Sequence, residues 1–320
     1  MILKSADDKS KRLRLLESLC DAPVLDAKQK DWARQELDRQ RKGIQGEKSA
    51  AHYLDNYLRD SKNLVLIHDL RIVVDGETAQ IDHLLMSRGG NIFLFETKNF
   101  NGNVTINEQG EFTVSYGAGQ RYGIPSPIEQ SRRHANVLDK LLSQLGIEPR
   151  VGGRFNYLHL VLLDPKATIT RPSTKAFDTS WVMKADMFQT WHTAWRDNGP
   201  GVLDTFKMFA NVRSQETLQE WGEKLLRQHR PADTLELPDF MKPRAVQARP
   251  AMLASKPETP ASGGDAQTIT PHHAPDSLAR KLICAHCNAK ISFAEGKFCW
   301  GNERRFGGLQ YCRDHQALFK

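Results

Sequence analysis

Residues 80–100 have the sequence QIDHLLMSRGGNIFLFETKNF, and this stretch decides the fold. Two apolar runs, residues 81–86 and 92–95, lie on either side of the Gly89-Gly90 pair. Apolar residues on both faces of a short run are typical of a buried strand, and a glycine turn between two such runs predicts a β-hairpin. The two strands carry charged groups at their far ends, where burial is costly without a partner or a metal.

The register of this hairpin would bring four polar side chains together. If residues 88–90 form the loop, Asp82 lies opposite Glu96 and Gln80 lies opposite Lys98, all on one face of the sheet. Opposed residues are about 5 Å apart at Cβ, so the two carboxylates repel each other and favour a divalent cation. Mg²⁺ suits such oxygen ligands, and a neighbouring lysine could orient a water. An ion pair between the acids and Lys98 is the alternative that spacing alone leaves open.

The same residues resemble a known family. Asp82 followed by Glu96-Thr97-Lys98 resembles the D…ExK signature of restriction-endonuclease-like (PD-(D/E)xK) nucleases. QIDH at 80–83 together with ETKNFNG at 96–102 is similar, more specifically, to the nuclease-related domain (NERD). Gly46-Glu47 matches that family's Gly-Glu on a preceding helix, and Pro127-Ile128-Glu129-Gln130 matches its later Pro-x-x-Gln. The resemblance covers roughly residues 43–165, and Ile81 departs from the proline that many wider relatives carry there.

This resemblance implies an α/β fold with a restriction-endonuclease-like core, a central mixed sheet flanked by helices. It also implies a Mg²⁺-dependent (or Mn²⁺-dependent) DNA endonuclease or DNA-processing protein that hydrolyses phosphodiester bonds. Asp82 and Glu96 would bind the metal, and Lys98 would position the attacking water. The outer residues of the site would be Glu47, Gln80 and Gln130. For Gln130, a capping or core hydrogen bond is an equal alternative, and His83 should point away from Asp82.

The last 37 residues hold four of the five cysteines. Cys284-Ala285-His286-Cys287 and Cys312-Arg313-Asp314-His315 form a CxxC…CxxH pattern. Thiolate and imidazole in paired knuckles suit tetrahedral Zn²⁺, and a segment this short needs a metal to fold. We therefore expect Cys284, Cys287, Cys312 and His315 to bind Zn²⁺, with Cys299 as the alternative fourth ligand in place of the histidine.

A non-catalytic module is the rival hypothesis. In that case the acids and the lysine form a structural ion network, and the protein binds nucleic acid or another protein, with the zinc module recruiting the partner. The zinc module interleaves basic and aromatic residues, which favours nucleic acid and is also compatible with protein contacts. Intact Asp82, Glu96 and Lys98 favour the enzyme.

Composition and net charge bear on the partners and the location of the protein. The 320 residues carry a net charge of +7 and a pI near 9.1, which moderately favours polyanions such as DNA as partners. No run approaches the roughly 20 apolar residues that span a membrane, and the N-terminus lacks a signal-peptide core, so we expect a cytoplasmic protein without membrane contact. No dimer signature is evident, and the oligomeric state stays open.

Changes in composition, together with the extent of the resemblance, divide the chain into five predicted parts. They are a charged helical extension at 1–42, the nuclease core at 43–170, a helical continuation at 171–230, a proline-rich flexible linker at 231–280 and the zinc module at 281–320. Within the core, the pattern predicts the order helix, three strands, helix, strand.

Overall fold

The computed structural model describes residues 1–100, 102–117, 119–198, 202–241, 282–285, 287, 289–306 and 309–317, with side chains omitted at 202–204 and 303–304. The chain divides into two compact units, Met1–Val246 and Gln247–Lys320, each described by itself. Most of the predicted linker, from residue 242 to residue 280, lies outside the described residues. No helix in the described part of the chain has the length and apolar character that a membrane crossing requires.

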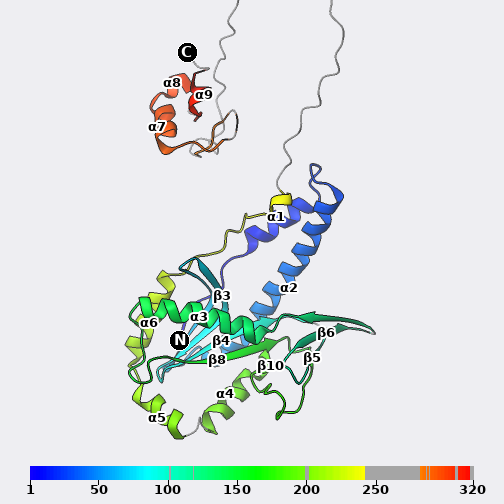
Figure 1. Cartoon of the computed structure of the whole chain (residues 1–320), viewed down its shortest axis with the longest axis vertical. Coiled ribbons are helices and arrows are strands. Elements are labelled where there is room, and N and C mark those ends of the chain that lie inside the picture. The colour runs from blue at the N-terminus through cyan, green and yellow to red at the C-terminus, as the bar shows by residue number, and fades with distance from the viewer. Residues whose placement is uncertain are drawn as a thin grey trace, which may run out of the picture. The chain divides into compact units, whose positions relative to one another are not determined.

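The first unit is built on a six-stranded mixed sheet with strand order β1-β2-β3-β4-β8-β10 (Figure 1). The strands β2, β3 and β4 form an antiparallel meander, and the other neighbours pair in parallel. Their bounds are Ile2–Lys4 (β1), Leu64–Val74 (β2), Glu77–Ser87 (β3), Asn91–Lys98 (β4), Asn156–Leu163 (β8) and Val182–Lys184 (β10). The expected central mixed sheet flanked by helices is confirmed.

Helices cover both faces of this sheet. One apolar cluster packs β2, β3 and β4 against α3 (Pro127–Gln144) and α6 (Gln215–Arg227). A second cluster, on the other face, packs them against α2 (Ala27–Leu58) and α4 (Phe188–Asp197). Figure 1 shows α3 lying across the strands and α2 extending beyond them. The predicted order of helix, three strands, helix and strand is found as α2, β2–β4, α3 and β8.

The remaining elements extend this core. A second sheet has the order β7-β6-β5-β9, in which β5 and β6 pair antiparallel as a hairpin. Helix α1 packs against α2, and residues 231–241 contact both helices. Arg12 of α1 donates to the Glu236 carbonyl, Gln29 of α2 donates to the Phe240 carbonyl, and the ring of Trp32 meets that of Phe240. The bounds are Ser10–Cys20 (α1), Asn103–Ile106 (β5), Phe112–Tyr116 (β6), Gln120–Ile124 (β7), Thr168–Thr170 (β9), Ala185–Met187 (η1), Val202–Ala210 (α5) and Asp239–Met241 (η2).

The central hairpin has the predicted loop and register. Strand β3 ends at Ser87 and β4 begins at Asn91, so the loop is the expected 88–90, and Gly90 adopts a φ of +81° there. The ladder pairs Met86 with Ile92 and continues to His83 opposite Phe95, where it ends one pair before Asp82 and Glu96. The strands therefore part at the residues that carry the charges.

A bend interrupts β2 and β3 at the same level. Asp69 has a φ of +53°, a left-handed conformation that is rare for a residue with a side chain. In a regular strand, residues two apart point to the same face of the sheet. Here Ile67 and Leu70, which are three apart, both belong to the apolar cluster under α3, and so do Ile81 and Leu84. The alternation of faces thus slips by one residue in both strands, at Asp69 and at Asp82.

The second unit is small. Its helices are α7 (Phe293–Gly301), α8 (Glu303–Phe306) and α9 (Arg313–Gln316), and an isolated bridge joins Ile283 to Lys290. Ser292 and Glu295 form a capping box at the start of α7, which fixes where that helix begins. The described core holds only five buried side chains: Cys284, Ile291, Cys299, Phe306 and Tyr311. Such a core is too small to stabilise a fold without a further cross-link.

Two glycines of α2 provide a matched test of how this helix packs. A Cβ on Gly46 would lie 2.5 Å from Cβ of Asn99, whereas a Cβ on Gly43 would meet nothing within 4 Å. Both changes to alanine improve helix propensity, by about 0.5–1 kcal/mol. We expect Gly43→Ala to raise the free energy of unfolding by that amount, and Gly46→Ala to lower it by about 1–3 kcal/mol because of overpacking. Urea unfolding of the two variants checks this, and equal stability of both would show that Asn99 moves aside freely.

Candidate active site

The end of β4 places an acid and a base side by side. The Nζ atom of Lys98 lies 2.7 Å from Oε1 of Glu96 and 3.2 Å from Oε1 of Gln130 on α3. Glu96 is buried, with 3% of its surface exposed. The alternation of β4 carries Glu96 and Lys98 to the face under α3, because Ile92 and Leu94 belong to that apolar cluster. The structure therefore brings Lys98, Glu96 and Gln130 together.

Asp82 lies at the point where β3 and β4 separate. Its Oδ2 accepts the backbone N–H of Thr97 at 2.7 Å, an interaction that takes the place of the next rung of the ladder. Burial, and then the charges of Glu96 and Glu47, raise the pKa of Asp82 well above its usual value. Burial likewise raises the pKa of Glu96, with Lys98 opposing the change and Glu47 adding to it. These carboxylates are close enough to repel one another, as the hairpin register predicts.

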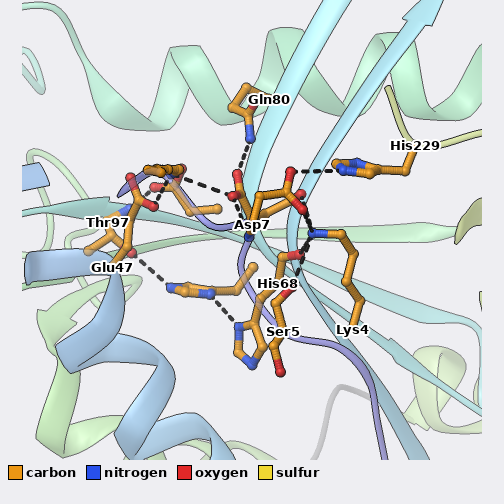
Figure 2. A network of polar contacts seen from close by, with 12 residues as sticks. Lys4, Ser5, Asp7, Glu47, His68, Gln80, Thr97 and His229 are labelled. Carbon is orange, nitrogen blue, oxygen red and sulfur yellow. Dashed lines mark hydrogen bonds and ion pairs between the residues drawn. The ribbon is translucent and has the colours of Figure 1, made fainter. Parts of the chain in front are cut away.

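Gln80 does not join this group as expected. Its side chain donates a hydrogen bond to Oδ1 of Asp69 (Figure 2). Its neighbours Ala79 and Ile81 point into the cluster under α3, so Gln80 points to the face of α2, away from Lys98. The prediction that Gln80, Asp82, Glu96 and Lys98 share one face is wrong, because the alternation slips at Asp82. The site lies instead at the end of the sheet, where side chains from both faces meet.

Glu47 approaches from α2, one residue after Gly46. Its Oε2 is 2.6 Å from Nζ of Lys9, a residue that lies directly before α1. The same ammonium is 3.5 Å from Oδ2 of Asp69. Glu47 thus takes its expected place near Asp82 and Glu96, to which it contributes negative charge.

Sequence reasoning missed Asp69 and Lys9. Asp69 is buried, with 4% of its surface exposed, and continuing the register of β2 and β3 places it level with Asp82. In the sequence, the signal for Asp69 was the polar interruption between two apolar runs, one that ends at Ile67 and one that begins at Ile72. Lys9 had no such signal, because only the fold brings the charged N-terminal extension to the end of the sheet.

Helix α3 contributes more than Gln130. One turn later, Nδ1 of His134 lies 4.0 Å from Oε2 of Glu96, and burial lowers the pKa of this histidine. The charge of Arg133 acts on Glu96 as well. The spacing of 130 and 134 marks one helical face, so the Pro-x-x-Gln pattern could have pointed to His134 as well.

A chain of buried hydrogen bonds lies behind the acids, on the face of α2. His68 and His83 face each other with their Nδ1 atoms 2.6 Å apart, and burial lowers the pKa of both rings. Nε2 of His68 is 2.8 Å from Oδ1 of Asp55, and Nε2 of His83 is 3.2 Å from Oγ1 of Thr97.

The carboxylate at one end fixes the direction of these bonds. Two neutral rings can satisfy the chain only if His68 donates to Asp55, His83 donates to His68, and Thr97 donates its hydroxyl proton to His83. Thr97 in turn donates its backbone N–H to Asp82. His83 therefore supports the strand end and does not enter the site, in agreement with the face expected for it.

The second unit gathers a different set of ligands. Ligand atoms of Cys284, Cys287, Cys312 and His315 all lie within 4.8 Å of one another, and among the described residues this is the one group of three or more such side chains that converges. Sγ of Cys287 and Sγ of Cys312 are 3.9 Å apart. Two thiolates on a tetrahedral Zn²⁺ are separated by about 3.8 Å, since each Zn–S bond is about 2.3 Å. The donor set and its spacing fit zinc.

Cys299 stands apart from that group. Its sulfur accepts the backbone N–H of Tyr311 at 3.3 Å and contacts the side chain of Gln316 at 3.4 Å. The residue is fully buried in the small core. Of the two alternatives for the fourth ligand, the structure brings His315 into the group, whereas Cys299 packs beneath it.

Comparison with known proteins agrees with this geometry. No curated protein and no solved structure matches the chain. The sequence model of one family, described as the nuclease-related domain (NERD), matches residues 42–169. That segment contains Glu47, Asp82, Glu96, Lys98 and Gln130, and it ends before α4. Residues 42–169 of this chain, 128 of its 320 residues, are therefore similar to the nuclease-related domain.

Proposed function

We propose that the first unit is a divalent-metal-dependent nuclease that hydrolyses phosphodiester bonds in DNA. The observation that carries the proposal is the pair of half-buried Asp82 and buried Glu96, both with raised pKa values, beside the ammonium of Lys98. Burying like charges together is unfavourable unless a cation compensates them. Among the described residues, Lys98 forms an ion pair with Glu96 and none with Asp82, so the site favours a further cation.

The donor set fits Mg²⁺ or Mn²⁺. Two carboxylates, with waters and substrate phosphate completing the shell, are typical of Mg²⁺ sites in proteins, and Asp82 and Glu96 would be those ligands. A bound cation would offset the charge of the phosphate and lower the pKa of a water. Among the described residues, no group of three or more acids converges closely enough to hold one ion, and Mg²⁺ does not require a third carboxylate.

The side chains around the pair have distinct tasks in this proposal. The ammonium of Lys98 has three N–H donors. Glu96 and Gln130 accept two of them, which within the described residues leaves the third for the attacking water or a phosphate oxygen. Gln130 thus orients Lys98, and Lys98 also offsets the negative charge that develops on the phosphate. The backbone N–H of Thr97 holds the carboxylate of Asp82 in place.

Asp82→Asn and Glu96→Gln test the proposal. Each should lower Mg²⁺-dependent cleavage of DNA by about 100-fold or more, the effect of removing one group that stabilises developing charge. Thermal unfolding should stay unchanged or rise in temperature, because removing one of two close carboxylates relieves their repulsion. Glu108→Gln, a change on the exposed loop between β5 and β6, is the matched control and should cleave normally.

Cleavage that survives both substitutions would exclude this site as its origin. If the wild-type protein shows no metal-dependent cleavage, the second candidate function, a non-catalytic binding module, is favoured. The ion pair between Lys98 and Glu96 is the observation behind that candidate, because the same contact can serve a purely structural network.

For the second unit we propose one structural Zn²⁺ bound by Cys284, Cys287, Cys312 and His315. Elemental analysis of the full chain should find one zinc per chain in the wild type and in Cys299→Ala, and none in Cys312→Ser. Removing the metal with a chelator should unfold residues 282–317, since the small core alone does not stabilise them. Loss of zinc from Cys299→Ala with retention in His315→Ala would instead make Cys299 the fourth ligand.

The zinc module should contribute affinity for DNA. Described side chains include the basic Lys290, Lys297, Arg305 and Arg313 and the exposed rings of Phe293 and Phe298. Deleting residues 278–320 should weaken DNA binding and flatten its dependence on salt, because fewer phosphate contacts release fewer counterions. Single-turnover cleavage at saturating DNA should change less than the affinity. An unchanged affinity in a fluorescence-anisotropy titration would indicate that the module binds protein instead.

A further inference from the structure

The N-terminal segment reaches the acidic site from outside the family domain. Strand β1 pairs with β2, and the Nζ atom of Lys4, its last residue, donates to the carbonyls of His68 and Asp69 at 3.1 and 3.0 Å. The backbone N–H of Asp7 donates to Oδ2 of Asp69 at 3.0 Å, and the carboxylate of Asp7 is held by Lys4 and His229 (Figure 2). These contacts hold the chain against the bend in β2 and bring it to Lys9.

Lys9 lies between two carboxylates from different elements. Its Nζ is 2.6 Å from Glu47 on α2 and 3.5 Å from Asp69 on β2. Burial lowers the pKa of Lys9, but the charges of Glu47, Asp69 and Asp82 outweigh this and raise it, so the ammonium is fully charged at neutral pH. No ion pair joins Lys9 to a carboxylate oxygen of Asp82 or Glu96 in the described structure. The lysine therefore compensates one side of the site and leaves the other side open.

The charges in the site then balance with a single divalent cation. The four acids are Glu47, Asp69, Asp82 and Glu96, and the two ammonium groups are Lys9 and Lys98. Two negative charges remain among these six groups when all are ionised, and Arg133 also acts on Glu96, so the excess is at most the charge of one Mg²⁺ or Mn²⁺. Lys98 and Lys9 lie at opposite ends of this group, one against Glu96 and the other against Glu47 and Asp69.

We infer that Lys9 is a positioning residue of the nuclease site: its ammonium takes the place of a second cation between Glu47 and Asp69 and so limits the site to one divalent cation, at Asp82 and Glu96. The inference rests on the proposed function, since it concerns the same metal site. It adds a residue from outside residues 42–169 to the working parts of the domain. An ordinary surface ion pair would link two exposed side chains, whereas Asp69 is buried and in a left-handed conformation that the N-terminal segment holds.

The test counts Mn²⁺ ions bound to the full, zinc-loaded chain by electron paramagnetic resonance. Wild type should bind one Mn²⁺. Lys9→Met should bind two, with a spin-coupled signal, because Glu47 and Asp69 then lack their cation. Lys9→Arg, which restores the charge, should bind one. Lys11→Met, a change at a neighbouring exposed lysine of α1, is the matched control and should also bind one.

A double variant separates loss of a cation from loss of structure. Lys9→Met combined with Glu47→Gln should return to one Mn²⁺, since the second ion would need both carboxylates. Near-ultraviolet circular dichroism checks that each variant is folded. If Lys9→Met does not fold, Lys9→Gln carries the test with the same expected second ion, because it keeps a hydrogen-bond donor toward Glu47 and removes only the charge.

The possible outcomes are distinct. If wild type and Lys9→Met each bind one ion, the inference is overturned and the proposed function stands. If wild type binds two ions, the inference is likewise overturned and the proposed function likewise stands. No ion in wild type and one in Lys9→Met would show that Lys9 blocks the cation site, which also overturns it. No ion in wild type or in any variant would end the proposed metal-dependent function and the inference with it.

Discussion

The repulsion between Asp82 and Glu96 is the constraint around which the end of this sheet is organised. Glu96 is buried and Asp82 is half-buried, and removal from water alone would favour their neutral forms. The surroundings counter that tendency on three sides, with Lys98 against Glu96, the N–H of Thr97 against Asp82, and Lys9 against Glu47. Four carboxylates share two lysines here, an excess of negative charge that the proposed cation would offset.

Much of the fold and part of the site could be predicted from the sequence, because the information was local. A three-residue loop fixes the register of a hairpin, so the relative positions of Asp82 and Glu96 follow from counting residues. The two CxxC-like knuckles bring their ligands together for the same reason, as the convergence of Cys284, Cys287, Cys312 and His315 shows.

What could not be predicted depends on contacts between distant parts of the chain. The slip in alternation at Asp69 and Asp82 follows from a left-handed backbone that a residue other than glycine adopts only when its surroundings stabilise it. Those surroundings come from Asp7, Lys9 and Gln80, which contact the carboxylate of Asp69. The local conformational propensities of the strand residues carry no information about these distant contacts. The prediction that Gln80 and Lys98 share a face therefore fails, although the predicted register is correct.

Strand β1 has a further consequence for the sheet. It covers part of the outer edge of β2, an eleven-residue strand whose N–H and C=O groups would otherwise point outward along that edge. Exposed edges of long strands pair readily with other chains, and natural sheets avoid this by covering them. The short N-terminal strand thus shields part of this edge from pairing with other chains. The same segment leads the chain to Lys9, so it serves both the edge of the sheet and the acidic site.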